Sequence, residues 1–329
     1  MQIEHRKNSA AEKAENLVSV IIPTFNAIDH IDETLASVFA QSYPLIEVIV
    51  VDDGSTDNTL RTLEKYQSKI TVIAQKNAGV GAARNNGARA ARGEFLAFMD
   101  HDDVLDSSKI DLQVALLKEF PQALATYCDH RTIDETGNLI GSTGALNNPR
   151  PSGDILTALL SGARIITPAV SLVRKQAWEL VSGFRDGTEV RSCEDYDFWL
   201  RLSAKGAILY MPKTLVSYRL HEQQMSQQAD YLCGRAKAHL NCARAISDII
   251  NQAGDQRKLN FYKLHYFEQL LEAAWEARQN RNTKEAFRYA LEACSLRLYE
   301  PSAWAALVKS LFVWPATAKN EVARTNNRN

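Results

Sequence analysis

The sequence predicts an α/β protein, with an open and mostly parallel sheet flanked by helices and followed by an α-helical C-terminal region. From Leu17 onward, apolar runs of strand length alternate with stretches of helical periodicity, the pattern of βαβ units. After about residue 226, every periodic stretch is helical. The chain of 329 residues, 45% hydrophobic and 23% charged, has the composition of a globular protein.

Four β-rich apolar runs are the predicted strands of the first sheet, at residues 17–22, 46–51, 70–74 and 94–99. Amphipathic stretches between and after them predict helices at residues 26–41, 56–66, 79–91 and 107–120. In the first helix, Asn26 is the expected N-cap, with Ile28, Ile31, Leu35, Val38 and Phe39 on one face. Asp106 or Ser107 is expected to cap the last of them.

The remaining chain is less regular, and we expect a hairpin at residues 134–144 and an antiparallel helix pair at 261–278 and 282–298. The expected organisation is a flexible leader at 1–16, a main domain at 17–226 and a helical region at 227–329. The main domain divides into halves at 17–103 and 104–226.

Charge and cysteine content exclude several classes of protein. With 38 Lys and Arg against 39 Asp and Glu, the chain has no overall attraction for nucleic acid. Five cysteines without CxxC spacing disfavour a disulfide framework and indicate free thiols in a reducing compartment. We expect no secretory signal and no bilayer span, and hence a cytoplasmic protein. Residues 302–318 are compatible with peripheral contact with the inner face of the membrane, and equally with packing on the main domain.

Polar residues follow each of the four strands, at 23–26, 52–57, 75–79 and 100–103. In an open α/β sheet, ligands bind outside the carboxyl ends of the strands. These four segments are therefore expected to form one ligand-binding rim.

The segment after the fourth strand contains Asp100, Asp102 and Asp103. Three adjacent carboxylates repel one another, and a divalent cation with oxygen ligands is the usual partner that relieves such repulsion. The sequence therefore predicts a metal site here, with Asp103 as a turn or supporting residue.

Asp52 and Asp53 end the second strand, and Gly54 follows in a turn. A turn needs only one carboxylate, so the other is free to accept from a base N–H or a sugar hydroxyl. An EF-hand is rejected because the loop lacks its final Glu.

The Gly79-Val80-Gly81 run follows the third strand and has Arg84 in place of a closing glycine, so it is not a dinucleotide fingerprint. The backbone amides of this run, together with Arg84, are able to bind an anion such as a diphosphate. The alternative interpretation is that Arg84 is an ordinary surface arginine.

Glu194, Asp195 and Asp197 precede an amphipathic helical stretch. The helix macrodipole alone explains acids at this position, and a general base is the second interpretation. Further on, Arg219 and His221 lie on one side of an extended segment. A single histidine in such a place is more often a structural residue than a ligand.

Together, the motifs resemble those of the family 2 inverting glycosyltransferases, which have the GT-A fold. The matching motifs span residues 16–225 in the family's order: VSVIIPTFN, VIVVDDGSTDNT, NAGVGAARNNG, GEFLAFMDHDD, GFRDGTEVRSCEDYDFWLRL and YRLH. The resemblance implies a metal-dependent enzyme that moves a sugar from a nucleotide-diphosphate donor, expected to be UDP-linked, to an acceptor hydroxyl in glycan synthesis. Residues 17–103 would bind the donor, and residues 104–226 would face the acceptor.

The resemblance also implies roles for individual residues. Donor-binding residues would be Pro23, Thr24, Asp52 or Asp53, Arg84 and Asp100. Asp100 and Asp102 match the DxD element, and Asp102, with Asp100 and His221, would hold Mn²⁺ or Mg²⁺. Asp195 would be the catalytic base, with Glu194, Asp197 and Trp199 on the acceptor side.

The acceptor implied is a glycan, a lipid-linked molecule or a protein. Two alternatives stay open: another nucleotide-sugar-binding enzyme such as a nucleotidyltransferase, and a noncatalytic adaptor acting through the helical tail. A nucleotidyltransferase usually needs a glycine- and lysine-rich phosphate loop after the first strand, and PTFNAIDH has no such loop.

Overall fold

The computed structural model describes residues 14–141, 150–161, 167–187, 190, 193–221, 224 and 235–310. The chain divides into two compact units, with the boundary between Cys233 and Gly234. The sequence placed this boundary at residues 226 and 227.

Within the described residues, the first unit is built on a nine-stranded sheet with the order β3-β2-β1-β4-β8-β6-β9-β5, and β7 pairs with β6. Strands β1 to β4 pair in parallel, which confirms the predicted sheet. Strand β8 is antiparallel to both β4 and β6, so the sheet is mixed beyond β4. The strands are β1 (Ala14–Thr24), β2 (Ile46–Asp52), β3 (Thr71–Ala74), β4 (Gly93–Phe98), β5 (Val104–Leu105), β6 (Ala125–Ile133), β7 (Leu139–Gly141), β8 (Ser171–Arg174) and β9 (Ile208–Arg219).

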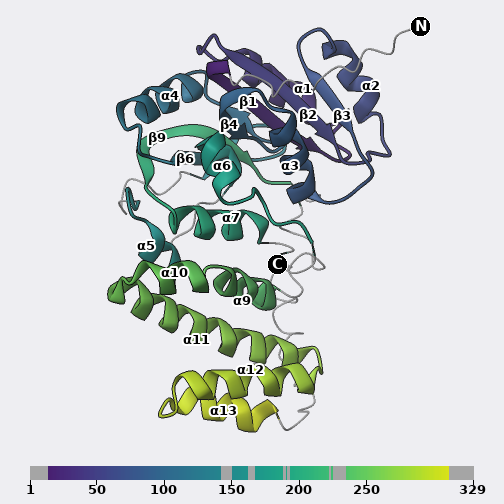
Figure 1. Ribbon diagram of the computed structural model, residues 1–329. Coiled ribbons are helices and arrows are strands. Elements are labelled where there is room, and N and C mark those ends of the chain that lie inside the picture. Colours follow the sequence, from purple (N-terminus) through teal and green to yellow (C-terminus); the bar gives the residue numbers. More distant parts are fainter. Residues whose placement is uncertain are drawn as a thin grey trace, which may run out of the picture. The chain divides into compact units, whose positions relative to one another are not determined.

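Helices flank this sheet (Figure 1). Helix α3 approaches β1 and β2 closely because Gly87 has no side chain: a β-carbon there would lie 2.4 Å from Cγ2 of Ile21. The helices of the unit are α1 (Ile31–Phe39), α2 (Thr59–Leu63), η1 (Glu64–Tyr66), α3 (Val80–Ala90), α4 (Lys109–Glu119), α5 (Leu156–Leu160), η3 (Pro168–Val170), α6 (Lys175–Leu180) and α7 (Glu194–Ser203).

Strand β1 begins at Ala14, within the segment predicted as a leader. The backbone N–H of Asn16 donates to the Glu94 carboxylate at 3.0 Å, and its carbonyl accepts from the Tyr43 hydroxyl at 2.6 Å. These long-range contacts extend the strand beyond its apolar run. Residues 1–13 of the predicted leader lie outside the described residues.

The prediction for the start of α1 was wrong. Asn26 adopts a left-handed conformation with φ of 50°, and its side-chain oxygen accepts from the Thr56 N–H at 2.8 Å. This tie to the loop after β2 delays the helix to Ile31 and leaves Ile28 exposed. The start of α4 also differs, since Ser108 occupies the cap position and the Asp106 carboxylate accepts from its N–H at 3.0 Å.

The predicted hairpin is present as the β6–β7 pair up to Gly141, and residues 142–144 of the prediction lie outside the described residues. Asp134 closes its turn by accepting from the backbone N–H groups of Thr136 and Asn138, each at 2.9 Å.

Apolar side chains of the parallel strands form most of the core of this unit, but α4 also buries Lys109. Its ammonium donates to the Gln113 side chain at 2.7 Å and to the Ser171 carbonyl at 3.0 Å. Burial lowers the pKa of Lys109 to about 8.

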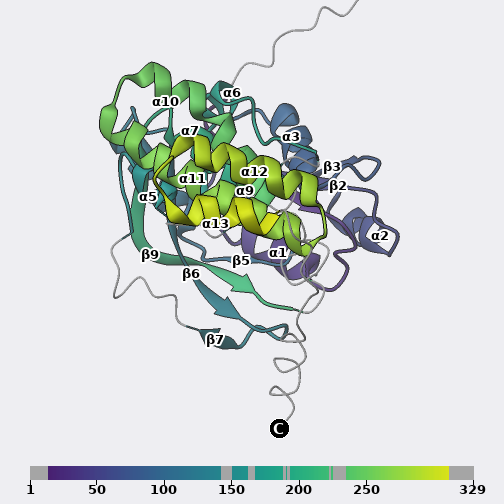
Figure 2. The same cartoon turned by 90° about the horizontal axis from the view of Figure 1, so that it is seen from below.

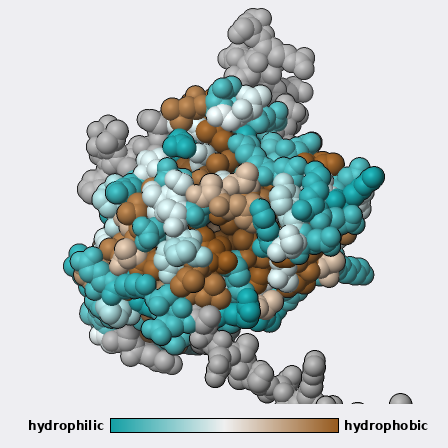
Figure 3. Space-filling model, turned by 90° about the horizontal axis from the view of Figure 1, so that it is seen from above, coloured by the Kyte–Doolittle hydropathy of each residue, from teal (hydrophilic) through white to brown (hydrophobic). Residues whose placement is uncertain are grey.

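Outside the core, Figure 3 shows a face of the molecule on which hydrophobic side chains gather in the middle and polar ones surround them.

Because of Lys109, the unfolding free energy of the protein should change with pH in the alkaline range. Because the folded state releases this proton near pH 8 and the unfolded chain near 10.5, the unfolded state holds more protons between these values, and stability rises with pH there. Relative to Lys109→Met, the wild type should gain unfolding free energy on the order of 3 kcal/mol across this window. Urea unfolding at several pH values measures this gain. The exposed Lys118→Met on the same helix should parallel the wild type, and a parallel course for Lys109→Met would contradict the assignment.

The second unit consists of helices in the described range, which are α9 (Arg235–Ala245), α10 (Ser247–Ala253), α11 (Gln256–Gln279), α12 (Thr283–Leu296) and α13 (Pro301–Ser310). Figures 1 and 2 show α11, α12 and α13 side by side. Their core gathers Leu240, Phe267, Leu270, Tyr289 and small residues including Ala286 and Ala290. The predicted helix pair is therefore confirmed, and α13 adds a third member.

No helix of the described residues is long and apolar enough to cross a membrane. The described cysteines, Cys128, Cys193, Cys242 and Cys294, are buried and form no disulfide.

Candidate active site

The carboxyl ends of β1 and β2 lie side by side, because Thr24 is in register with Asp52. Pro23 and Thr24 are buried, and the Thr24 hydroxyl donates to the Val51 carbonyl at 3.3 Å. Phe25, the next residue, is 44% exposed. The sheet thus presents an aromatic side chain at the predicted rim.

Asp52 and Asp53 differ in their contacts. The carboxylate of Asp53 accepts from the backbone N–H groups of Ala78 at 2.8 Å and Gly79 at 2.9 Å, and from the Gln75 amide at 2.8 Å. It therefore shapes the loop that precedes α3. One oxygen of Asp52 accepts from the Ser55 N–H at 3.2 Å, and the other is buried without a partner among the described residues.

Asp100 is joined to Arg84, whose Nη2 lies 2.6 Å from its Oδ1. Its other oxygen accepts from the Thr167 hydroxyl at 3.2 Å. Arg84 is buried, and its guanidinium lies 5.4 Å from the centre of the Phe184 ring. The charged group of α3 is thereby held beside the end of β4.

Asp102 faces His221, with 2.9 Å between Oδ2 and Nε2. Burial opposes ionisation of Asp102, but the hydrogen bond with His221 keeps the pKa of this carboxyl below its usual value. The same hydrogen bond raises the pKa of His221. The His30 ring lies 5.2 Å from that of His221. Residues far apart in sequence thus form a carboxylate–imidazole pair.

Arg219, at the end of β9, is fully buried behind this pair. Its Nε donates to the Asp102 carbonyl at 2.9 Å, and Nη2 lies 2.6 Å from the Glu33 carboxylate. Nη1 donates to the carbonyls of Asp134 at 3.1 Å and Glu135 at 3.0 Å. One guanidinium therefore joins the acidic turn, α1 and the β6–β7 hairpin.

Asp103 also serves this junction. Its carboxyl accepts from the Arg219 backbone N–H at 3.1 Å, and it is completely buried. Burial and the neighbouring Asp102 and Asp100 raise the pKa of Asp103 well above its usual range. Asp103 accordingly supports the turn from inside.

The first turn of α7 carries Glu194 and Asp195, both half-buried. A β-carbon added at Gly81, in the first turn of α3, would lie 3.6 Å from Cγ of Glu194, so the two helix starts are in contact. Burial raises the pKa of Asp195, and the charge of Arg84 opposes this rise. Asp195 is thus a carboxylate close to the Arg84–Asp100 pair.

Two residues predicted on the acceptor side lie in the interior. Asp197 is fully buried, with its oxygens 2.7 Å from Arg185 Nη2 and 2.6 Å from Arg201 Nη2. Trp199 is only 1% exposed. Residues 197–203 of α7 are buried all round the helix, so Asp197 and Trp199 are both shielded from solvent rather than exposed on the predicted acceptor side.

The donor atoms at the strand ends determine whether a divalent cation fits there. Among the described residues, no three His, Cys, Asp or Glu side chains converge as a metal site. Asp100 is turned to Arg84 and Thr167, and Asp102 with His221 supplies one oxygen and one nitrogen. Mg²⁺ is usually held by one or two carboxylates plus substrate phosphates and water, so this pair fits a cation that arrives with a phosphorylated ligand.

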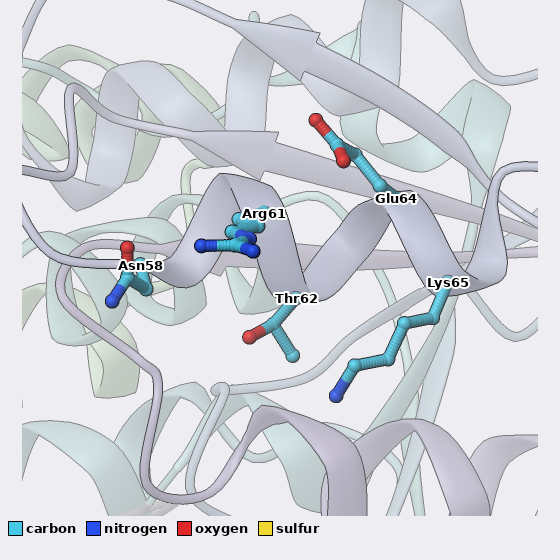
Figure 4. A pocket seen from close by; sticks show the side chains of 5 residues that line it. All are labelled: Asn58, Arg61, Thr62, Glu64 and Lys65. Atoms are coloured by element: carbon cyan, nitrogen blue, oxygen red, sulfur yellow. The ribbon is translucent and has the colours of Figure 1, made fainter.

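A separate surface hollow of about 510 Å³ is lined by Asn58, Arg61, Thr62, Glu64 and Lys65 (Figure 4). All five residues come from one short stretch of α2 and η1, and none is a predicted site residue. The residues at the strand ends remain the candidate site.

Comparison with known proteins identifies the family. Residues 19–180 match the model of glycosyl transferase family 2. An uncharacterized glycosyltransferase of Haemophilus influenzae is 35% identical over 220 residues, which cover 64% of this chain and 67% of that protein. The chain belongs to glycosyl transferase family 2.

Some sequence relatives are longer than this chain. Chondroitin synthase of Escherichia coli is 32% identical over 221 residues, and the chain spans only 31% of its length. Solved structures support the fold. TarS of S. aureus in complex with UDP-GlcNAc matches with a TM-score of 0.57 at 21% identity, covering 89% of each chain. The mannosyltransferase PcManGT of Pyrobaculum calidifontis, with GDP-Man and Mn²⁺, matches at 0.55 and 18% identity, covering 92% of this chain and 88% of its own. The predicted GT-A fold is confirmed.

For this family 2 chain, the sequence alone missed several contacts of the site. Thr167 and Glu33 carried no recognisable signal, because only folding brings them to Asp100 and Arg219. Phe25 had a signal, since it is an aromatic residue directly after a buried strand.

Proposed function

We propose that the protein is a metal-dependent inverting glycosyltransferase that moves a sugar from a nucleotide-diphosphate donor to an acceptor hydroxyl. The observation that carries this proposal is the meeting of Asp102 with His221, and of Arg84 with Asp100, at one edge of the sheet. This arrangement provides a carboxylate–imidazole pair for a cation and a buried guanidinium for phosphate charge.

The donor is proposed to be UDP-linked. TarS, a fold relative, was solved with UDP-GlcNAc, and chondroitin synthase is a sequence relative. The nucleoside would lie at the ends of β1 and β2, where Phe25 offers an aromatic face and Asp52 a buried oxygen without a described partner. Asp53 would act indirectly, by holding the loop at Ala78 and Gly79.

Asp195 is the proposed general base. It would take the proton from the acceptor hydroxyl while that oxygen attacks the anomeric carbon on the face opposite the leaving diphosphate. One displacement inverts the configuration. Arg84, which interacts with both Asp100 and Asp195, would stabilise charge on the diphosphate.

Asp102 and His221 would hold a divalent cation, Mn²⁺ or Mg²⁺, which would supply positive charge against the departing diphosphate. The acceptor is proposed to be a hydroxyl of a glycan, a lipid-linked molecule or a protein, in the synthesis of a polysaccharide or cell-surface glycan.

A panel of nucleotide sugars tests this proposal. Thermal unfolding with Mn²⁺ or Mg²⁺ should show a rise in Tm for the true donor, because a ligand that binds only the folded state stabilises it. Release of the nucleoside diphosphate should then be detectable. Pyrophosphate release from a nucleoside triphosphate and a sugar phosphate would favour a nucleotidyltransferase. Absence of any Tm shift or turnover, with a partner bound by residues 227–329, would favour an adaptor.

Asp102→Ala should remove the metal dependence of donor binding, because it deletes one of the two proposed metal ligands. Isothermal titration of UDP with and without Mn²⁺ should show the metal-dependent gain reduced by more than about tenfold. Asp106→Ala is the matched control, since the Asp106 carboxylate serves Ser108 in the next helix. Equal Mn²⁺ dependence in Asp102→Ala and wild type would refute the metal assignment.

A further inference from the structure

The second unit exposes a group of large apolar side chains where α12 turns into α13. This corner patch consists of Leu298, Tyr299, Trp304 and Val308, and Tyr299 is 97% exposed. The Trp304 indole donates to the Leu298 carbonyl at 2.7 Å, which holds these two residues together. Trp304 and Val308 are four residues apart on α13 and therefore lie on one helical face.

The charge of the chain is divided unevenly. Residues 235–329 contain 15 Lys and Arg against 9 Asp and Glu, whereas residues 1–234 contain 23 against 30. The helical part is thus positive and the family 2 domain negative. Such an asymmetry suggests contact between the positive part and an anionic surface.

We propose that the corner patch docks on the surface of an anionic phospholipid membrane. Trp and Tyr have an apolar body and a polar tip, which suits the boundary between headgroups and acyl chains. Lys309 is exposed beside Val308, and Arg297 is exposed beside Leu298 and lies 3.8 Å from Glu300. The charges of Lys309 and Arg297 would meet anionic headgroups. Surface docking does not require a membrane span, and no helix of the described residues is able to form one.

A protein partner or a second copy of the chain is a less good match. Either would explain the apolar residues, but a symmetric dimer through the corner patch would bring two positive helical units together, and a protein partner would need an acidic surface of its own. The docking proposal is independent of sugar transfer, because its readout is binding to lipid.

Cosedimentation of the full chain with vesicles tests the proposal. Binding should be strong to phosphatidylglycerol mixed with phosphatidylcholine, weak to phosphatidylcholine alone, and reduced by salt. The double variant Tyr299→Ser, Trp304→Ser should lower the partition coefficient by about tenfold or more, because two large side chains lose burial. Lys309→Glu should lower it by about fivefold or more.

Trp275→Ser is the matched control, since Trp275 is 61% exposed on α11 outside the patch. It should bind as the wild type does. Equal loss in Trp275→Ser, equal binding to both kinds of vesicle, or unchanged binding by the double variant would overturn the proposal. So would absence of vesicle binding together with a concentration-dependent dimer that the double variant abolishes. Circular dichroism of each variant should show unchanged helicity.

Discussion

Asp195→Asn should lower kcat by roughly 10²- to 10⁴-fold while leaving donor binding nearly unchanged. The amide retains the size of the side chain but is unable to take the acceptor proton. Asp195 stands in the first turn of α7, and the loss of one acid there should cost little stability beyond its favourable interaction with the helix dipole. Steady-state kinetics with saturating donor and acceptor measures kcat, and a titration with UDP measures binding.

The pH profile gives a second readout for Asp195. Burial raises the pKa of this carboxyl, and only its ionised form accepts a proton, so turnover of the wild type should fall as the pH drops through that raised pKa. The residual activity of Asp195→Asn should lack this acidic limb. Glu194→Gln is the matched control at the neighbouring position. If turnover survives in Asp195→Asn and collapses in Glu194→Gln, the base is Glu194.

Arg219→Ala should have the largest effect on stability. The variant removes a buried cation that satisfies three carbonyls, those of Asp102, Asp134 and Glu135, and pairs with Glu33. Removing one partner from a buried charged network typically costs about 3 to 5 kcal/mol. We therefore expect a loss of about 3 kcal/mol in the unfolding free energy, because Glu33 is half exposed and regains water. Urea denaturation measures the loss.

Arg219 should also position the proposed metal ligands, since it bonds to the Asp102 carbonyl and lies two residues before His221. Mn²⁺ titration in the presence of UDP, followed by electron paramagnetic resonance, should show weaker binding in Arg219→Lys, which keeps the charge but not the planar fork of donors. Arg131→Ala, on the neighbouring strand, removes a bond to the Ser217 hydroxyl and should change stability by less than about 0.5 kcal/mol. Wild-type Mn²⁺ affinity in Arg219→Lys would limit Arg219 to a structural role.

Agreement between sequence and structure is best in the strands and poorest at the helix starts. The four apolar runs became β1 to β4 within a few residues. Strands β1, β2 and β4 are buried and need continuous apolar runs, whereas β3 is a largely exposed edge strand. Asn26 was placed wrongly as a cap because its side chain is held by Thr56, thirty residues away, and local preference gives no sign of that contact. Local preference likewise gives no sign that Asp197 and Trp199 are buried, because their burial depends on the elements that pack against α7.

By itself, the sequence determined the class of fold, the polar segments at the carboxyl ends of the strands and the order of motifs that marks the family. Parallel strands bring their carboxyl ends to one edge, so strand periodicity alone is enough to predict the rim. Only the tertiary structure decided which acids do what. Asp53 holds a loop, Asp103 is buried under Arg219, Asp100 pairs with Arg84, and Asp102 faces His221. The reason is that a carboxylate's role follows from the donors and charges around it, and folding brings those from distant parts of the chain.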